Sequence, residues 1–208
     1  MIDRFHINSR WQLLLVSFML LSKITSAQQI PPFELTKDGI EPIVIIVDSL
    51  NASQLYRKTL NWIQENYKNP REVLKVDLKN EKVRIEDIKK NVWFYSISDT
   101  TFYYDVEYFF NVNFEYNKIS MSFDFGNTWN RSAQYVTHSY RINYKKLWKQ
   151  NGEVHPIYKE TKPGIDQMMN EISLSLINYL RDDKKDLEEE KHSDWLRWRN
   201  KIKSKVIY

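Results

Sequence analysis

The chain has 208 residues, a formal net charge of +4, four glycines and no cysteine. Without cysteine it cannot form a disulfide or use a thiol nucleophile, so its stability has to come from a packed core. Four scattered glycines cannot assemble a Gly-rich phosphate-binding loop. The near-neutral charge balance gives no electrostatic reason to expect a nucleic-acid partner.

Residues 1–27 have the features of a secretory signal peptide. Arg4 and Arg10 precede the uncharged apolar run WQLLLVSFMLL, and the small residues Thr25, Ser26 and Ala27 follow it. The apolar run is about half of the roughly 20 residues that a membrane-spanning helix needs, which favours cleavage over a permanent anchor. We therefore expect cleavage after Ala27 and a periplasmic or secreted protein. It is not a lipoprotein, because no cysteine is available for lipid attachment.

The segments that follow predict one α+β domain at residues 40–181, preceded by a leader. Residues 28–39 contain Pro31 and Pro32 and are expected to be an extended leader that does not pack. Ile43–Val47 is a continuous apolar run of strand length, which is typical of a central strand covered on both faces.

An amphipathic helix is expected next, beginning at Asn51 and ended by Pro70. Asn51 can act as the N-cap, with Gln54 as the partner of a capping box. Apolar side chains then recur at helical spacing and form a broad stripe, which indicates packing against a sheet. The stripe consists of Leu55, Tyr56, Thr59, Leu60, Trp62, Ile63 and Tyr67.

Four strands should follow this helix. Residues 74–78 and 82–86 alternate apolar and charged side chains on either side of a turn at Asn80-Glu81. Residues 102–116 and 119–125 predict a long hairpin that turns at Asn117-Lys118. At about 3.3 Å per residue its first arm would reach roughly 50 Å, so we expect a bend, bulge or break near Tyr103–Asp105.

The rest of the domain should contain one weak strand and a second long helix. Residues 126–160 are mostly loop, with weak alternation at residues 136–142. Thr161 can cap a helix whose apolar stripe includes Ile165, Met169 and Leu176. The fold class is therefore α+β, with a curved antiparallel sheet, two long helices packed on one face, and the order β-α-β-β-β-β-α.

The first helix and its flanking strands also resemble a known family. The pattern D-x-L-x-A-x-x-L-Y-x-x-x-L-x-W-I-x-E-N-Y-K-N-P, followed by V-L-K-V-D, is similar to the DUF4468 family of secreted Bacteroidota proteins of unknown function with a TBP-like fold. The matching positions are Asp48, Leu55, Tyr56, Leu60, Trp62, Tyr67 and Pro70. The resemblance covers roughly residues 40–88. It implies a curved antiparallel sheet with helices on one face and assigns no catalytic residue.

The residues of the chain do not form a familiar catalytic or metal-binding motif. His138, His155 and His192 lie far apart without zinc-ligand spacing, and there is no G-x-S-x-G elbow. We expect no metal and no cofactor. Asp105 and Glu107 lie on the polar face of their strand, where paired acids can act on a glycosidic bond or be ordinary solvated side chains.

Residues 182–208 form a charged extension that we expect to be helical. Six acids precede a basic segment in which Trp195, Trp198, Ile202 and Val206 recur at helical spacing. Such a stripe suits either an anionic membrane surface or, as we favour, docking on the domain or on a second copy. The candidate contact residues are Trp195, Arg197, Trp198, Arg199, Lys201 and Lys203.

The sequence therefore favours a non-enzymatic binding or structural module of the cell envelope. Its partner would be an unknown protein or envelope component and not a nucleic acid, because the aromatic sheet positions belong to the face that the helices should cover. Two alternatives stay open. One is a hydrolase-like enzyme with acids on the exposed sheet face, and the other is a membrane-peripheral protein held by its basic C-terminal helix.

Overall fold

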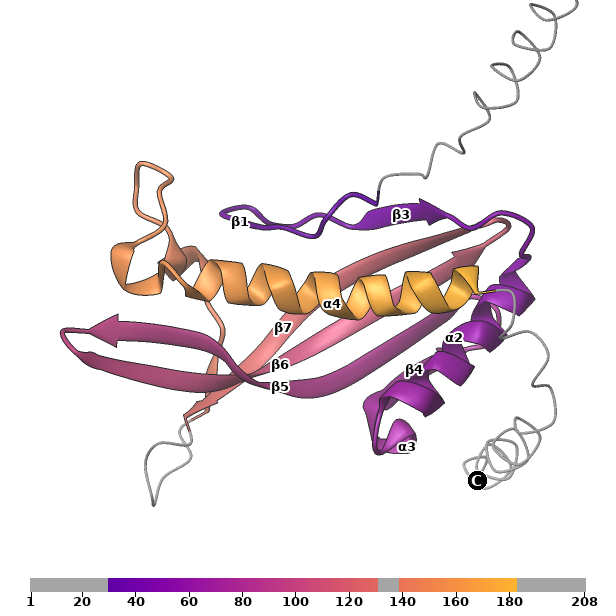
Figure 1. Ribbon diagram of the computed structural model, residues 1–208, viewed down its shortest axis with the longest axis horizontal. Helices are drawn as coiled ribbons and strands as arrows, with labels where there is room; N and C mark the ends of the chain where they lie inside the picture. Colours follow the sequence, from indigo (N-terminus) through magenta and orange to yellow (C-terminus); the bar gives the residue numbers. More distant parts are fainter. Residues whose placement is uncertain (1–29, 131–138, 183–208) are drawn as a thin grey trace, which may run out of the picture. The chain divides into compact units, whose positions relative to one another are not determined.

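The computed structural model describes residues 30–130 and 139–182. Contacts within the chain separate residues 1–31 from residues 32–208, and the fold below belongs to the second unit. Its main sheet has the strand order β3-β7-β6-β5-β4, with β8 paired to the end of β7, and every pairing is antiparallel (Figure 1). The strands are β3 (Ile43–Ile46), β4 (Leu74–Leu78), β5 (Lys82–Ile97), β6 (Thr100–Glu115), β7 (Lys118–Asn130) and β8 (Ser139–Arg141).

Helix α2 (Ala52–Asn66) begins as the sequence predicts. The Asn51 side chain accepts a hydrogen bond from the Gln54 N–H at 3.0 Å, and the Gln54 side chain accepts one from the Asn51 N–H at 2.9 Å. The capping box is therefore confirmed. The helix ends before Pro70, which instead begins the one-turn helix α3 (Pro70–Val73), the position that proline favours because its missing N–H needs no partner there.

Helix α4 (Thr161–Arg181) lies beside α2 on the same face of the sheet (Figure 1). The Trp62 Nε1–H of α2 donates to Ser175 Oγ at 3.0 Å, and the Tyr179 hydroxyl donates to Glu65 Oε1 at 2.7 Å. The predicted pair of helices on one face and the order β-α-β-β-β-β-α are therefore confirmed. The cap is different: Glu160 is the N-cap residue, because the Thr161 hydroxyl donates to the Phe94 carbonyl of β5.

The core lies between these helices and the inward face of the sheet. The β6 side chains of one parity, Val106, Tyr108, Phe110, Val112 and Phe114, are all buried. The Phe110 ring stacks on Phe123 with centroids 4.6 Å apart and meets Trp62 edge-on at 6.3 Å. One aromatic cluster therefore joins α2 to the two central strands.

The expectation that residues 28–39 do not pack is wrong for Phe33 and Leu35, which are 2% and 0% exposed. The Phe33 N–H donates to Asn170 Oδ1, and Asn170 Nδ2 donates back to the Phe33 carbonyl, both at 2.8 Å. The Leu35 N–H donates to Asp166 Oδ1 at 2.7 Å. Polar side chains of α4 thus hold this segment, which continues into the short strands β1 (Leu35–Thr36) and β2 (Gly39–Ile40).

The expectation of a central strand at Ile43–Val47 is also wrong. Strand β3 pairs only with β7 among the described strands, so it lies at an edge of the sheet. Its side chains alternate between buried and exposed, with Val44 and Ile46 54% and 49% exposed. An apolar run of four residues is therefore no proof that both faces of a strand are covered.

The predicted irregularity near Tyr103–Asp105 is confirmed as a bulge in the paired strand. Residues 90–92 of β5 stand opposite Asp105 alone, and Asn91 has a positive φ of 57°. A second bulge places Gly126 and Asn127 of β7 opposite Glu107. Beyond Tyr104, which still pairs with Asn130 of β7, the ends of β5 and β6 continue as a two-stranded arm (Figure 1).

The connection to α4 is more regular than the sequence indicates. Strand β7 runs through Gly126 to Asn130, and β8 provides the strand expected near residues 136–142. Two short 3₁₀ helices follow, η1 (Tyr144–Leu147) and η2 (Pro156–Tyr158). The Tyr158 ring of η2 packs edge-on against Trp93 and Tyr95 of the arm, which anchors this connection to the sheet.

Candidate functional site

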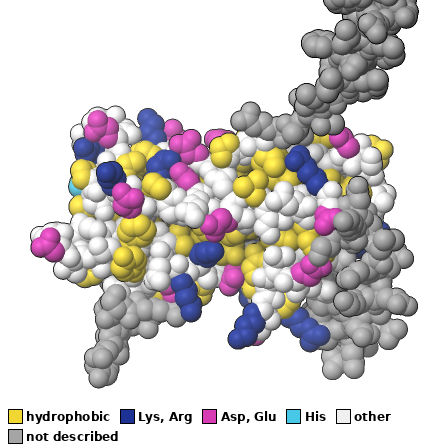
Figure 2. Space-filling view, in the orientation of Figure 1, with side chains coloured by type: hydrophobic (Ala, Val, Ile, Leu, Met, Phe, Trp, Pro, Cys, Tyr) yellow, Lys and Arg dark blue, Asp and Glu magenta, His cyan; other side chains and the backbone are white. Residues whose placement is uncertain are grey.

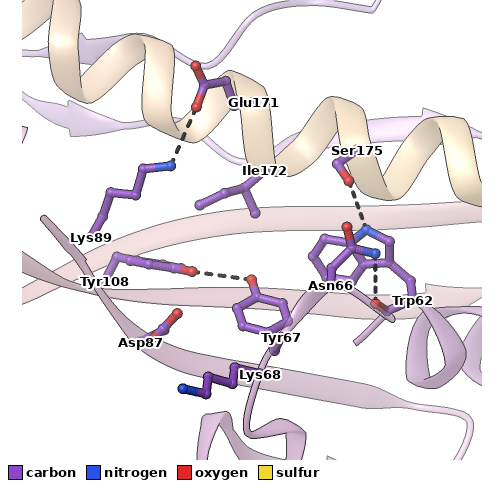
Figure 3. Close-up of a pocket in the computed structure, with 10 residues that line it drawn as sticks. All are labelled: Trp62, Asn66, Tyr67, Lys68, Asp87, Lys89, Tyr108, Glu171, Ile172 and Ser175. Atoms are coloured by element: carbon purple, nitrogen blue, oxygen red, sulfur yellow. Dashed lines mark hydrogen bonds and ion pairs between the residues drawn. The ribbon is translucent and has the colours of Figure 1, made fainter. Parts of the chain in front are cut away.

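A pocket of about 330 Å³ opens where the end of α2, the middle of α4 and strands β5 and β6 meet (Figure 3). These elements come from three distant parts of the sequence, so only the fold brings the lining together. The pocket is lined by Trp62, Asn66, Tyr67, Lys68, Asp87, Lys89, Tyr108, Glu171, Ile172 and Ser175.

One wall is built from hydrogen-bonded side chains of the two helices. Trp62 is buried, and its Nε1–H donates to Ser175 Oγ at 3.0 Å. Asn66 Nδ2 donates to the Trp62 carbonyl at 2.9 Å, which ties the last turn of α2 to the same wall. Because these donors already have acceptors, this wall is fixed in position and not poised for chemistry.

The middle of the pocket holds two tyrosine hydroxyls. Tyr67 OH and Tyr108 OH lie 3.2 Å apart and share a hydrogen bond (Figure 3). Burial raises the pKa of Tyr67 to about 12, against the hydrogen bond from Tyr108, which lowers it. Burial also raises the pKa of Tyr108, and the neighbouring Tyr67 and Asp87 raise it further. Both side chains are therefore neutral hydroxyl groups at physiological pH.

Charged side chains of both signs flank the two tyrosines. Lys89 Nζ and a Glu171 carboxylate oxygen are 3.6 Å apart on one side, and Lys68 and Asp87 lie on the other (Figure 3). Two lysines and two acids leave the lining without net charge. The same mixture holds over the described part of this face of the molecule, where acidic and basic side chains are interspersed (Figure 2).

This combination of groups is suited to binding more than to catalysis. A tyrosine whose pKa is about 12 is a weak acid and carries no charge with which to attack a substrate near neutral pH. Among residues 30–130 and 139–182, no three His, Asp or Glu side chains gather as metal ligands. What the lining offers is a set of donors and acceptors around an apolar wall.

The two acids that motivated the enzyme alternative hold the bulges of the sheet. Asp105 is 3% exposed, and its Oδ1 accepts a hydrogen bond from the Asn91 N–H at 3.1 Å. Glu107 Oε2 accepts one from the Asn127 N–H at 2.9 Å. Each carboxylate thus satisfies a backbone donor that a bulge removes from the regular ladder.

The C-terminal contact residues predicted from the sequence lie outside the described residues. These are Trp195, Arg197, Trp198, Arg199, Lys201 and Lys203, and their role stays a prediction. Within the described part of the chain, no helix combines the length and the hydropathy that crossing a bilayer requires.

One feature of the sequence points to the pocket: charged residues stand in strand β5 at positions where the alternating pattern predicts apolar ones. Val83 and Ile85 point to the core, and Asp87 and Lys89 continue the same parity along β5. Two charged residues therefore replace apolar ones on the inward face of a strand, where the pocket lies. Such a break in an alternating pattern indicates either a strand end or a site, and the structure is needed to distinguish them.

Comparison with known proteins supports the fold. Residues 43–125 match the family described as a domain of unknown function (DUF4468) with TBP-like fold. The crystal structure of a DUF4468 family protein from Bacteroides ovatus is 10% identical, with a TM-score of 0.55 over 75% of this chain and 92% of that one. A TBP-like protein from Parabacteroides distasonis is 9% identical, with a TM-score of 0.51 over 68% and 92%.

At such low identities the two solved structures inform the fold alone. No curated protein matches the sequence. Residues 43–125 thus resemble the DUF4468 family, and the chain has a TBP-like α+β fold, as the sequence resemblance implied.

Proposed function

We propose that this protein is a non-enzymatic binding module of the cell envelope that takes a small polar ligand in the pocket around Tyr67 and Tyr108. The observation that carries the proposal is a preformed pocket whose wall is fixed by hydrogen bonds and whose tyrosines are held neutral. Its volume of about 330 Å³ lies at the small end of the range for ligand sites.

The polar groups of the pocket support binding because they interact mainly with one another. The Tyr67–Tyr108 hydrogen bond and the Lys89–Glu171 ion pair both join side chains. A ligand can exchange these contacts for its own without leaving a backbone group unsatisfied. The Lys89 and Glu171 side chains are about half exposed, so desolvating them on binding is a modest cost.

A blocking variant tests this function. Ile172→Trp places an indole in the pocket, and Leu174→Trp adds the same side chain at an exposed position of the same helix. The probes are neutral monosaccharides, amino acids and inorganic phosphate. NMR measures the binding of each probe to the protein, by saturation transfer for the organic ones. We expect at least one class to bind the unmodified chain and Leu174→Trp, and not Ile172→Trp. Binding that survives Ile172→Trp, or no binding by any class, would overturn the proposal.

The envelope location is a proposal from the sequence. The apolar run and small residues before Gln28 support cleavage after Ala27 and export to the periplasm or beyond. Intact mass of the native protein in fractionated cells tests this. A species that begins at Gln28 in the soluble envelope fraction is expected, and an uncleaved species in the membrane would contradict it.

The basic tail supports a separable proposal of membrane contact. Trp195 and Trp198 share a helical stripe and are interleaved with Arg197 and Arg199. Deleting residues 191–208 should then abolish binding to vesicles of anionic lipid and leave pocket binding unchanged. Unchanged vesicle binding would leave docking on the domain or on a second copy as the role of the tail.

A further inference from the structure

We propose that the ligand of the Tyr67–Tyr108 pocket is a neutral polyhydroxylated molecule, a single sugar ring or the end of a glycan. This inference rests on the proposed function, since it names the chemical class that the same pocket takes. It is carried by three features of the pocket: the balance of its fixed charges, the chemistry of its tyrosine pair, and the mixture of apolar and polar wall.

The fixed charges disfavour a charged ligand. An anion drawn to the Lys89 ammonium is repelled by Glu171, whose carboxylate oxygen is 3.6 Å from that ammonium. A cation drawn to Glu171 is repelled by Lys89 in the same way. Because the pair is about half exposed and has no net charge, it attracts neither ion strongly. A neutral ligand can contact both members of the pair and leave it intact.

Hydroxyl groups fit this arrangement because each one both donates and accepts. A sugar hydroxyl can accept from the Lys89 ammonium while it donates to the Glu171 carboxylate. A neighbouring hydroxyl on the same ring can repeat this between Lys68 and Asp87, which line the other side of the pocket. An amino acid carries one ammonium and one carboxylate group. Each of these groups can pair with only one of two oppositely charged neighbours, because the other one repels it.

The tyrosine pair extends the same pattern through the middle of the pocket. Two hydroxyls carry two protons; the bond between Tyr67 and Tyr108 uses one of them, and Tyr108 also hydrogen-bonds Asp87. The remaining lone pairs can accept from a ligand hydroxyl, and a ligand hydroxyl can replace Tyr108 as the donor to Asp87. Because burial raises the pKa of both side chains, this capacity stays constant across physiological pH.

The apolar part of the wall suits the carbon face of a sugar ring. Ile172 is half-buried at the pocket, and the half-buried Tyr67 ring lies opposite it across the opening (Figure 3). The Trp62 ring meets the Tyr67 ring edge-on, with centroids 5.6 Å apart, and is held by its bond to Ser175. A ligand with a ring of C–H groups and a rim of hydroxyls is complementary to such a surface.

The experiment measures affinities by calorimetry and NMR for glucose, galactose, mannose, N-acetylglucosamine, alanine, glutamate and inorganic phosphate. Tyr67→Phe and Tyr108→Phe remove one hydroxyl each, and Tyr116→Phe is the matched control at a position 75% exposed on a turn. We expect at least one neutral sugar to bind, about tenfold weaker binding in either pocket variant, and no change in Tyr116→Phe.

Glu171→Gln provides a second variant that does not depend on the buried tyrosines. It frees the Lys89 ammonium from its carboxylate, so we expect weaker sugar binding and new binding of inorganic phosphate. Phosphate or amino acids as the only ligands of the unmodified chain would overturn the sugar inference and leave the binding function in place. If no probe binds, or if sugar binding is indifferent to Tyr67→Phe, Tyr108→Phe and Ile172→Trp, both proposals fail.

Discussion

The two faces of the sheet use their polar residues differently. On the open face, Asp105 and Glu107 accept hydrogen bonds from the backbone N–H groups of Asn91 and Asn127, and so they shape the strands. On the helix-covered face, polar side chains of the described residues gather at the junction of α2, α4 and β5, where they mainly contact each other. A second polar contact on this face joins the Tyr56 hydroxyl of α2 to Asp77 Oδ1 of β4. Carboxylates on a polar strand face are therefore not by themselves indicators of a site, because the sheet itself uses them.

The aromatic residues divide between the two faces in the same way. Phe110 is fully buried between Trp62 and Phe123. Its neighbour Phe109 points to the open face, where the Arg84 guanidinium lies 4.3 Å from its ring centroid. Adjacent residues of one strand thus contribute to the hydrophobic core and to a partly solvated cation–π pair.

The largest expected effect comes from removing Phe110, the member of the two adjacent residues that packs in the core. Phe110→Ala should lower the free energy of unfolding by about 3–5 kcal/mol, because it leaves a cavity between α2 and the sheet. Phe109→Ala is the matched control and should cost about 1 kcal/mol. Urea unfolding followed by tryptophan fluorescence measures both. Equal losses in the two variants would contradict the assignment of the faces.

The next effect concerns the bulge at Asn91. Asp105→Ala removes a buried acceptor and should cost about 2–3 kcal/mol, because the Asn91 N–H loses the carboxylate that holds the bulge. Hydrogen exchange should show faster exchange of the amides around residues 90–92. A variant that unfolds like the unmodified chain would show that Asp105 is a spare carboxylate, which would return the enzyme alternative to consideration.

Local features of the fold were predictable from the sequence. The capping box of α2 depends on two residues three positions apart, and both are visible in the chain. An irregularity was expected from the length of the predicted strand, which is far above the usual strand length; β6 runs unbroken over Thr100–Glu115, and the bulge lies in β5. The order of helices and strands follows from the changes of period along the chain, and this part of the prediction agrees with the structure.

Features that depend on distant partners were not predictable. Phe33 is buried because Asn170, 137 residues away, binds both of its backbone groups. Strand β3 lies at an edge because of the strand order, which periodicity does not contain. The pocket has the same origin: Asp87 and Lys89 break the apolar alternation of β5, but only the packing of α2 and α4 shows that a cavity faces them.

The second bulge gives a smaller effect that can be isolated by a double-mutant cycle. A Cβ at Gly126 would lie 2.6 Å from Glu107 Cδ, so Gly126→Ala forces this side chain away from the Asn127 N–H. We expect a cost of about 1–2 kcal/mol. In a Glu107→Ala background the obstacle is gone, and Gly126→Ala should be close to neutral in urea unfolding. Additive losses would show that the glycine is needed for another reason.

The smallest expected effect on stability is at the pocket. It compares the cost of removing an acid from the helix-covered face with the cost of removing one from the open face. Glu171→Gln breaks the ion pair with Lys89 but keeps an amide that can still meet Gln167, whose Nε2 donates to Glu171 Oε1 at 2.8 Å. Because the pair is about half exposed, the free energy of unfolding should change by less than about 0.5 kcal/mol.

An acid of the open face, Asp105, is therefore expected to cost several times more to remove than an acid of the pocket. If Glu171→Gln destabilises the fold as much as Asp105→Ala does, the pocket carboxylate is a structural group, and it is not available to a ligand. The other outcome is that loss of the Glu171 carboxylate hardly changes the free energy of unfolding but changes which probes bind. The carboxylate then serves recognition and not stability, as expected for a binding site.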